Sequence, residues 1–333
     1  MRILALICFM LLFGGAASAD TQTVLWQETI TAYGREIVID VEIEVPMDVQ
    51  PGIYRVRTVS VSDSQGESPR RMQPEKRRGI AYRTKPEEAV AVSAIDRTYH
   101  ANGNPVSAGE ALDAVQAFLA PVLMQVQDVE LRLDELTVRS PRFIYNKDTG
   151  EWGEQVHPDE TGSYVFETSL WLDGLPVEPR KYPHWLDSRK YPFGTVFPQT
   201  PYWNSYLSVS ENNHRMMDVS MPTVIERTEE RVELAPFEAT KASLRALAER
   251  GLLRSILKIR MAYAAFDCGE EDVWELRPVW MTEAEIYWDE TKTADDTGYE
   301  PWYETVMTDV RTGEIIELRW ADGYVPPAED RAK

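Results

Sequence analysis

Cysteine is nearly absent from this chain of 333 residues. Only Cys8 and Cys268 occur, and Cys8 lies inside an N-terminal segment that we expect to be removed. The remaining chain then keeps one thiol and forms no internal disulfide, so its stability has to come from a hydrophobic core. Cys268 stands among Asp267, Glu270 and Glu271, whose negative charges disfavour a thiolate. We therefore expect a small, partly buried residue at this position and not a nucleophile.

Histidine is also scarce, and its positions do not form a metal-binding pattern. The four residues are His100, His157, His184 and His214, none of them spaced four apart as in a zinc-binding helix. Motifs for a serine nucleophile, a glycine-rich phosphate loop and a calcium loop are absent as well. With 55 acidic residues, a carboxylate pair suited to glycoside hydrolysis is always available and carries little information. We expect no metal, no cofactor and no enzymatic activity.

No long hydrophobic run occurs after the N-terminus, where the pattern is that of a signal peptide. Arg2 supplies the positive charge, residues 3–13 are apolar and residues 14–19 are small. This order predicts export and cleavage before Asp20. The apolar run is shorter than the roughly 20 residues of a spanning helix, and the residue before Cys8 is not small, which argues against a lipoprotein. We expect a secreted or extracytoplasmic protein without a transmembrane anchor.

Positive charge is in short supply. The formal net charge is −20, and removal of Arg2 with the signal peptide makes it more negative by one. Phosphate backbones need a basic surface, so we expect no nucleic-acid partner. The one basic cluster lies in a polar segment that we expect to be an exposed linker: Arg70, Arg71, Lys76, Arg77 and Arg78.

An alternation of apolar and polar residues predicts strands in the first part of the chain. In residues 36–45, apolar side chains alternate with mostly polar ones, which is the pattern of a half-buried strand. Residues 24–33 and 53–61 predict neighbouring strands. A polar break follows, from residue 63 to about residue 78.

Helical periodicity begins at two places. Ser107 and Glu110 have the spacing of a capping box, and Pro236 and Gly251 mark the start and stop of a second helix. Segments with strand alternation follow each helix, which suggests an internal repeat. We therefore predict an α+β fold of two helix-on-antiparallel-sheet units behind an N-terminal β region. The expected divisions are a signal peptide (1–19), an N-terminal β-rich region (20–100), a first α+β unit (105–232), a second α+β unit (233–325) and a polar tail (326–333).

Short phrases in both halves resemble PepSY modules. Trp274–Trp280 has the form Leu-x-Pro-x-Trp, and Thr308–Ile316 has the form Asp-x-x-Thr-Gly-Glu-Ile. Ser169–Val177 resembles the x-Gly-Ile-Pro-Val strand of tandem PepSY-like exported proteins of Gram-positive bacteria, to which the YycH and YycI regulators of a cell-wall sensor kinase are related in architecture. Gly34–Val45 resembles the start of uncharacterised secreted proteins of the Clostridia type. The resemblance implies cystatin-like units in a non-catalytic extracytoplasmic module, of a kind associated with peptidase inhibition or envelope regulation.

The aromatic-rich segment 182–206 is the most unusual part of the sequence. Prolines between its aromatic residues disfavour regular strand pairing and predict a long ordered loop over a sheet. Its aromatic side chains either pack the loop down or present flat apolar faces to a sugar or a peptide. The candidate binding residues are Trp185, Tyr191, Tyr202 and Trp203.

Three functional hypotheses follow, in order of preference. The first is a non-catalytic protein that binds a protein or peptide partner of the cell envelope, with pairing at a sheet edge as one route. The second is a carbohydrate or cell-wall binding module that uses the aromatic loop. The third is a hydrolase with carboxylate chemistry.

Overall fold

Two compact units make up the chain, and both are built from segments that are distant in sequence. The structure is a computed structural model that describes residues 21–32, 35–46, 49–65, 80–85, 89–156, 161–178, 203–210, 215–286, 302–320 and 323–325. Unit 1 contains Thr58–Leu170 and Trp203–Thr223, and unit 2 contains the described residues up to Arg57, those from Trp171 to Tyr202 and those from Val224 onward. The divisions expected from the sequence follow chain order instead.

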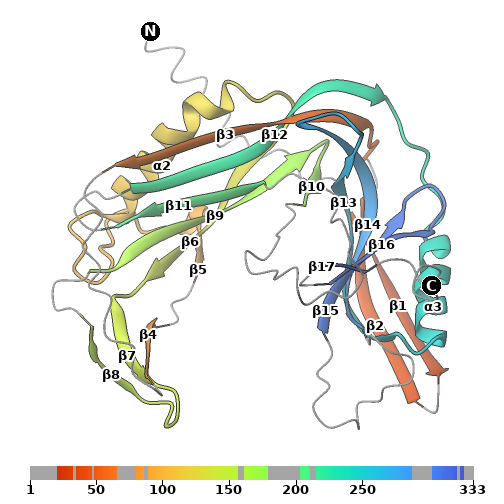
Figure 1. Cartoon of the computed structure of the whole chain (residues 1–333), viewed down its shortest axis with the longest axis horizontal. Helices are drawn as coiled ribbons and strands as arrows, with labels where there is room; N and C mark the ends of the chain where they lie inside the picture. The colour runs from red at the N-terminus through yellow and green to blue at the C-terminus, as the bar shows by residue number, and fades with distance from the viewer. Residues whose placement is uncertain are drawn as a thin grey trace. The chain divides into compact units, whose positions relative to one another are not determined.

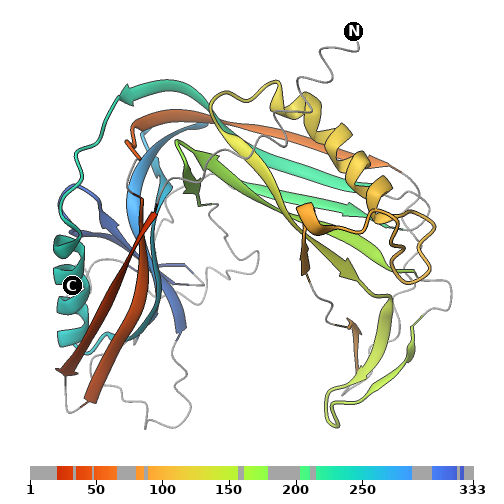
Figure 2. The same ribbon diagram turned by 180° about the vertical axis from the view of Figure 1, so that it is seen from behind.

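Unit 1 contains one α-helix and two sets of strands. The helix α2 (Ala108–Leu123) begins at Ser107, whose hydroxyl accepts from the Glu110 backbone while the Glu110 carboxylate accepts from the Ser107 backbone. The predicted capping box is therefore confirmed. Figure 2 shows α2 along the strands of this unit. The strands wholly in unit 1 are β4 (Ile80–Thr84), β5 (Ala89–Ala91), β6 (Glu130–Arg139), β7 (Arg142–Asn146), β8 (Trp152–Gln155) and β11 (Asn204–Val209), with a short 3-10 turn at Val92–Ala94.

Three long strands contain residues of both units: β3 (Ile53–Gln65), β9 (Ser163–Leu172) and β12 (Arg215–Glu229). Unit 2 adds the helix α3 (Phe237–Glu249) and the following strands (Figure 1): β1 (Thr21–Ala32), β2 (Arg35–Pro46), β10 (Leu175–Val177), β13 (Leu253–Asp267), β14 (Val273–Ile286), β15 (Trp302–Asp309), β16 (Ile315–Trp320) and β17 (Gly323–Val325).

The sheet of unit 2 is mixed because β13 has both parallel and antiparallel neighbours. It pairs antiparallel with β14, and parallel with β2 at Ile259↔Ile43 and with β10 at Val177↔Tyr263. The alternation predicted for residues 36–45 is confirmed, since Ile37, Ile39, Val41 and Ile43 are buried. Helix α3 contacts β1, β13 and β15. It follows Pro236 and ends before Gly251 (φ 70°), as predicted.

The predicted fold class is wrong. Strand residues far outnumber helical ones, the described residues contain only the two α-helices, and fourteen strands form a single mixed sheet. The chain is therefore not an α+β repeat of two helix-on-antiparallel-sheet units. The N-terminal strands are not a separate β region either, because β2 pairs with β13, more than 200 residues later in the chain. Local periodicity predicted most elements but not which of them pair.

Candidate functional site

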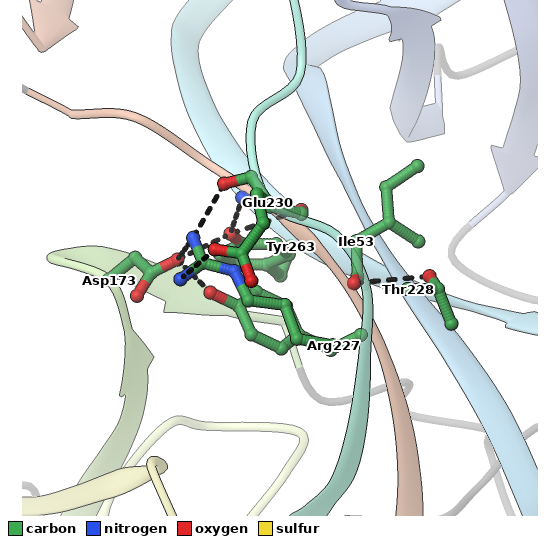
Figure 3. Close-up of polar contacts among 8 residues, drawn as sticks. Ile53, Asp173, Arg227, Thr228, Glu230 and Tyr263 are labelled. Atoms are coloured by element: carbon green, nitrogen blue, oxygen red, sulfur yellow. Dashed lines mark hydrogen bonds and ion pairs between the residues drawn. The ribbon is translucent and has the colours of Figure 1, made fainter.

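A polar cluster in unit 2 is built around the carboxylate of Asp173 (Figure 3). Asp173 lies in the turn between β9 and β10 and adopts a left-handed backbone conformation, with φ 50°. Its Oδ2 atom accepts a hydrogen bond from the hydroxyl of Tyr54 on β3, and the hydroxyl of Tyr263 on β13 lies 3.3 Å away. Two phenolic hydroxyls thus converge on one carboxylate oxygen.

Arg227, near the end of β12, supplies the positive charge of this cluster. Its Nη2 atom lies 3.7 Å from Asp173 Oδ2 and donates to the carbonyl oxygen of Glu230 at 2.7 Å. Its Nη1 atom lies 3.3 Å from Glu230 Oε2. The guanidinium also stands 5.2 Å from the centre of the Tyr54 ring, within the range of a cation–π contact. Four contacts thus hold the guanidinium of Arg227 in place.

Gly52 is the buried backbone contact of this cluster. Its backbone N–H donates to the Tyr263 hydroxyl at 3.1 Å. A Cβ atom at this position would lie 2.7 Å from the carbonyl oxygen of Glu229 and 2.8 Å from Nε of Arg227. The close approach of these backbones therefore requires glycine at position 52.

Tyr263 can act in this cluster only as a neutral group. Burial raises the pKa of its phenol far above the usual value, and the negative charge of Asp173 and the neighbouring Tyr54 raise it further. Its hydroxyl therefore stays protonated and accepts from Gly52 while it donates toward Asp173. Tyr54 and Tyr263 are buried, whereas the side chains of Asp173 and Arg227 are about one-third exposed (30% and 35%). The two buried tyrosines thus support a charged pair, Asp173 and Arg227, that lies at the surface.

The second feature of unit 2 is the edge strand β1. It pairs with β2 over its whole length, from Thr21↔Pro46 to Ala32↔Arg35, and no described strand pairs with its other side. In an antiparallel ladder, every second residue directs its N–H and C=O away from the paired strand. β1 contains no proline, no lysine and no bulge, the devices by which proteins usually block an edge.

One face of the β1–β2 hairpin packs inward and is held by α3. Trp26 and Ile30 are buried on this face. Between them, Glu28 accepts two hydrogen bonds from Arg245 of α3, from Nε and from Nη2, each at 2.8 Å. The inner face of the hairpin is therefore tied to α3 through Glu28 and Arg245.

The outer face of the hairpin is acidic. Four exposed carboxylates lie on one side of β2, and none of them forms an ion pair with a described basic residue: Glu36, Asp40, Glu42 and Glu44. Asp40 accepts a hydrogen bond from Gln27 of β1 at 3.1 Å. Two large apolar side chains, Leu25 and Val38, are more than half exposed on the same face, at 54% and 59%. This face thus combines four carboxylates that have no described ion pair with exposed apolar groups beside the edge strand β1.

The aromatic residues proposed from the sequence are only partly described. Trp203 is buried (1% exposed) and its Nε1 atom donates to Thr58 Oγ1 at 3.2 Å, so its ring presents no face to solvent. Trp185, Tyr191 and Tyr202 lie outside the described residues, and their role stays a prediction.

The other residues considered in the sequence, Cys268 and the histidines, have few described contacts. Cys268 is exposed and not partly buried as expected, and its sulfur lies 3.2 Å from the carbonyl oxygen of Val273. The Nδ1 atom of His100 contacts the carbonyl oxygen of Asn104 at 3.0 Å, and the other three histidines lie outside the described residues. The described part of the chain has no group of three potential metal ligands, and neither of its α-helices is long and apolar enough to cross a membrane.

The sequence did not reveal the cluster around Asp173. Its members come from four separate segments. A tyrosine in a predicted strand is usually a core residue, so neither Tyr54 nor Tyr263 indicated a polar cluster. The one local signal was the Asp173-Gly174 turn, since these residue types tolerate a left-handed conformation.

Comparison with known proteins adds little to this geometry. No protein-family model matches the chain, and no curated protein matches it. Among solved structures, an uncharacterised protein from Eubacterium rectale is similar with a TM-score of 0.40 and 13% identity, over 95% of this chain and 82% of that one.

Proposed function

We propose that this protein binds an extended segment of a cationic protein partner outside the cytoplasm, and that the segment adds to the sheet beside β1. The observation that carries the proposal is the edge of β1, which is twelve residues long, has no proline, lysine or bulge, and is paired on one side only among the described strands. A peptide that pairs there gains main-chain hydrogen bonds along the edge.

The negative charge on the outer face of the β1–β2 hairpin favours a basic partner. Glu36 and Asp40 lie beyond the short stretch where β2 pairs with β13, so the basic residues of β13 do not lie beside them. A strand with basic side chains on its outer face would relieve the repulsion along this row, and exposed Leu25 and Val38 offer contacts to its apolar groups. A second copy of this chain is a poor occupant, because it also carries a net charge of −20.

Synthetic peptides test this proposal directly. The probes are a fluorescent octapeptide of alternating valine and lysine, its valine–glutamate counterpart, and the valine–lysine peptide N-methylated at alternate residues. We expect anisotropy titrations to show binding of the first peptide only, with affinity that falls as salt rises. N-methylation removes backbone donors and should weaken binding at least about tenfold.

Protein variants locate the site. Asp40→Asn with Glu42→Gln should weaken binding about threefold to tenfold, because two attractive charges are lost. The matched control is Glu233→Gln with Glu271→Gln, which removes two exposed charges elsewhere in unit 2 and should change little. Equal binding of the lysine and glutamate peptides, or full binding of the N-methylated one, would refute the proposal. So would a stable dimer in sedimentation that Thr29→Pro in β1 dissociates.

A further inference from the structure

The small sheet β4–β7–β8 of unit 1 lacks a core of its own. None of the side chains on its three strands is buried. The strands pair only with one another, in the order β4-β7-β8 (Figure 1). Small sheets are marginally stable unless a hydrophobic face is covered. The aromatic side chains of this sheet nevertheless remain accessible.

One face of this sheet combines three aromatic rings with two cations. Opposite residues in the register share a face, which places Arg83 with Phe143 and Tyr145 with Trp152. The Arg83 guanidinium lies 4.8 Å from the centre of the Tyr145 ring, and Lys85 Nζ lies 4.2 Å from that of Phe143. The Tyr145 and Trp152 rings are 4.9 Å apart and tilted by 56°. Trp152 is 39% exposed at the end of this row.

The cations on this face have no acidic partner among the described residues. Arg83 and Lys85 are exposed, and neither forms an ion pair with a described carboxylate. Arg83 lies near the end of β4 and Lys85 follows its last residue, so the two are about 6.6–6.8 Å apart if the chain stays extended. The described residues 80–85 and 142–156 contain four basic and three acidic residues, in a chain whose net charge is −20. This sheet is therefore a local exception to the acidic character of the molecule.

We propose that the face formed by Arg83, Lys85, Phe143, Tyr145 and Trp152 binds an anionic polysaccharide. A sugar ring has an apolar face that packs on an aromatic ring and a rim of hydroxyls that remains hydrated. A carboxylate on that ring pairs with a guanidinium or an ammonium group. Exposed Trp152 supplies the first contact, and Arg83 and Lys85 supply the second. This site is separate from the edge of β1 and does not depend on the function proposed there.

Two other anionic ligands fit the observations less well. A nucleic acid gains its affinity from many phosphate contacts over an extended basic surface, whereas this face offers two cations, without a described ion pair, on a strongly acidic chain. An acidic peptide would satisfy the cations but lacks the flat apolar ring face that packs on exposed Trp152. Both ligands serve as competing probes.

The experiment uses the whole protein with hexagalacturonate as the probe, followed by tryptophan fluorescence and calorimetry. Maltohexaose is the neutral sugar control, and hexaglutamate and a six-nucleotide oligothymidylate are the anionic controls. We expect hexagalacturonate to bind at least about tenfold more tightly than any control. Arg83→Gln with Lys85→Gln should weaken that binding about tenfold or more, and Trp152→Ala about fivefold. Lys147→Gln removes an exposed charge from the β7–β8 turn and should have little effect.

Each alternative outcome is distinguishable. Equal affinity for hexaglutamate would mean that the face recognises charge alone, and preference for oligothymidylate would assign it to nucleic acid; either result overturns the proposal. Binding that survives Arg83→Gln with Lys85→Gln, or no binding of hexagalacturonate by the wild type, overturns it as well. Circular dichroism melting of each variant shows whether a loss of binding reflects a loss of fold.

Discussion

At the scale of single residues, the cluster around Asp173 shows how a few side chains hold distant backbone segments together. Tyr263 is its centre, since its one hydroxyl contacts Gly52, from the segment before β3, and Asp173, from the turn before β10. Its edge-to-face contact with Tyr54, at 5.9 Å between ring centres, is a second contact with the segment that contains Gly52. A residue with this position should matter more to stability than its size alone indicates.

We predict that Tyr263→Phe lowers the free energy of unfolding by about 1–3 kcal/mol, because the Gly52 N–H is left buried without an acceptor. Urea unfolding followed by tryptophan fluorescence measures the change. Tyr99→Phe is the matched control, because Tyr99 is 44% exposed and its side chain should contribute little. A loss for Tyr263→Phe no larger than for Tyr99→Phe would contradict the role of the hydroxyl.

At the scale of elements, the start of α2 is defined by its cap. The Ser107 hydroxyl accepts from Glu110 N at 3.2 Å, and Glu110 Oε2 accepts from Ser107 N at 2.8 Å. We predict that Ser107→Ala destabilises the protein by about 1 kcal/mol, since a donor of the first turn loses its partner. Ser93→Ala, in the 3-10 turn where no side-chain cap is present, is the control. Thermal unfolding of the two variants should separate their midpoints by about 1–2 °C, and equal midpoints would count against the cap.

The attachment of β1 to α3 should depend on pH. Hydrogen bonds from Arg245, and then from Trp26, lower the pKa of Glu28 below its usual value of 4.5. A carboxyl group whose pKa is lowered by folding stabilises the native state above its unfolded pKa, and this contribution is lost as pH falls through the folded pKa. Glu28 and Arg245 are partly exposed, at 27% and 40%, so we expect about 0.5–1 kcal/mol at neutral pH.

The comparison of wild type with Glu28→Gln measures this contribution. The difference in unfolding free energy should be present at pH 7 and should shrink toward zero as the pH is lowered below about 4. Glu233→Gln, which removes an exposed carboxylate without an ion pair, should show no such pH-dependent difference. A constant gap between wild type and Glu28→Gln from pH 7 to pH 3 would contradict the ion pair.

At the scale of the whole molecule, export is the prediction that rests on the sequence alone. Expression of the full chain in a bacterium with a general secretion pathway should yield a processed product whose first residue is Asp20. Intact mass and N-terminal sequencing of the product check this. Replacing Ala17 and Ala19 with bulky residues should block processing, because signal peptidase requires small residues there. A product that still begins at Met1 would contradict the signal peptide.

Much of the secondary structure was predictable because its signals are local. The capping box at Ser107, the stop at Gly251 and the alternation over residues 36–45 act within a turn or a strand, and the structure contains all three. The fold class was predicted wrongly because the pairing of strands is not local. Nothing near Ile43 indicates that its neighbour in the sheet is Ile259. A helix followed by strands suggested a repeat, whereas most of these strands belong to one mixed sheet and β7 and β8 belong to a small separate one.

The candidate sites divide in the same way. Several features follow from the sequence alone: the acidic charge, the scarcity of cysteine, the alternation of β2 that exposes its carboxylates, and the basic and aromatic residues around β4 and β7. Only the tertiary structure decided that β1 is an edge, that Arg83 and Lys85 lie over aromatic rings, and that Tyr54, Asp173, Arg227 and Tyr263 meet. Composition and periodicity are properties of neighbouring residues, but an edge or a cluster depends on which distant segments pair. That choice is made by packing the whole chain at once.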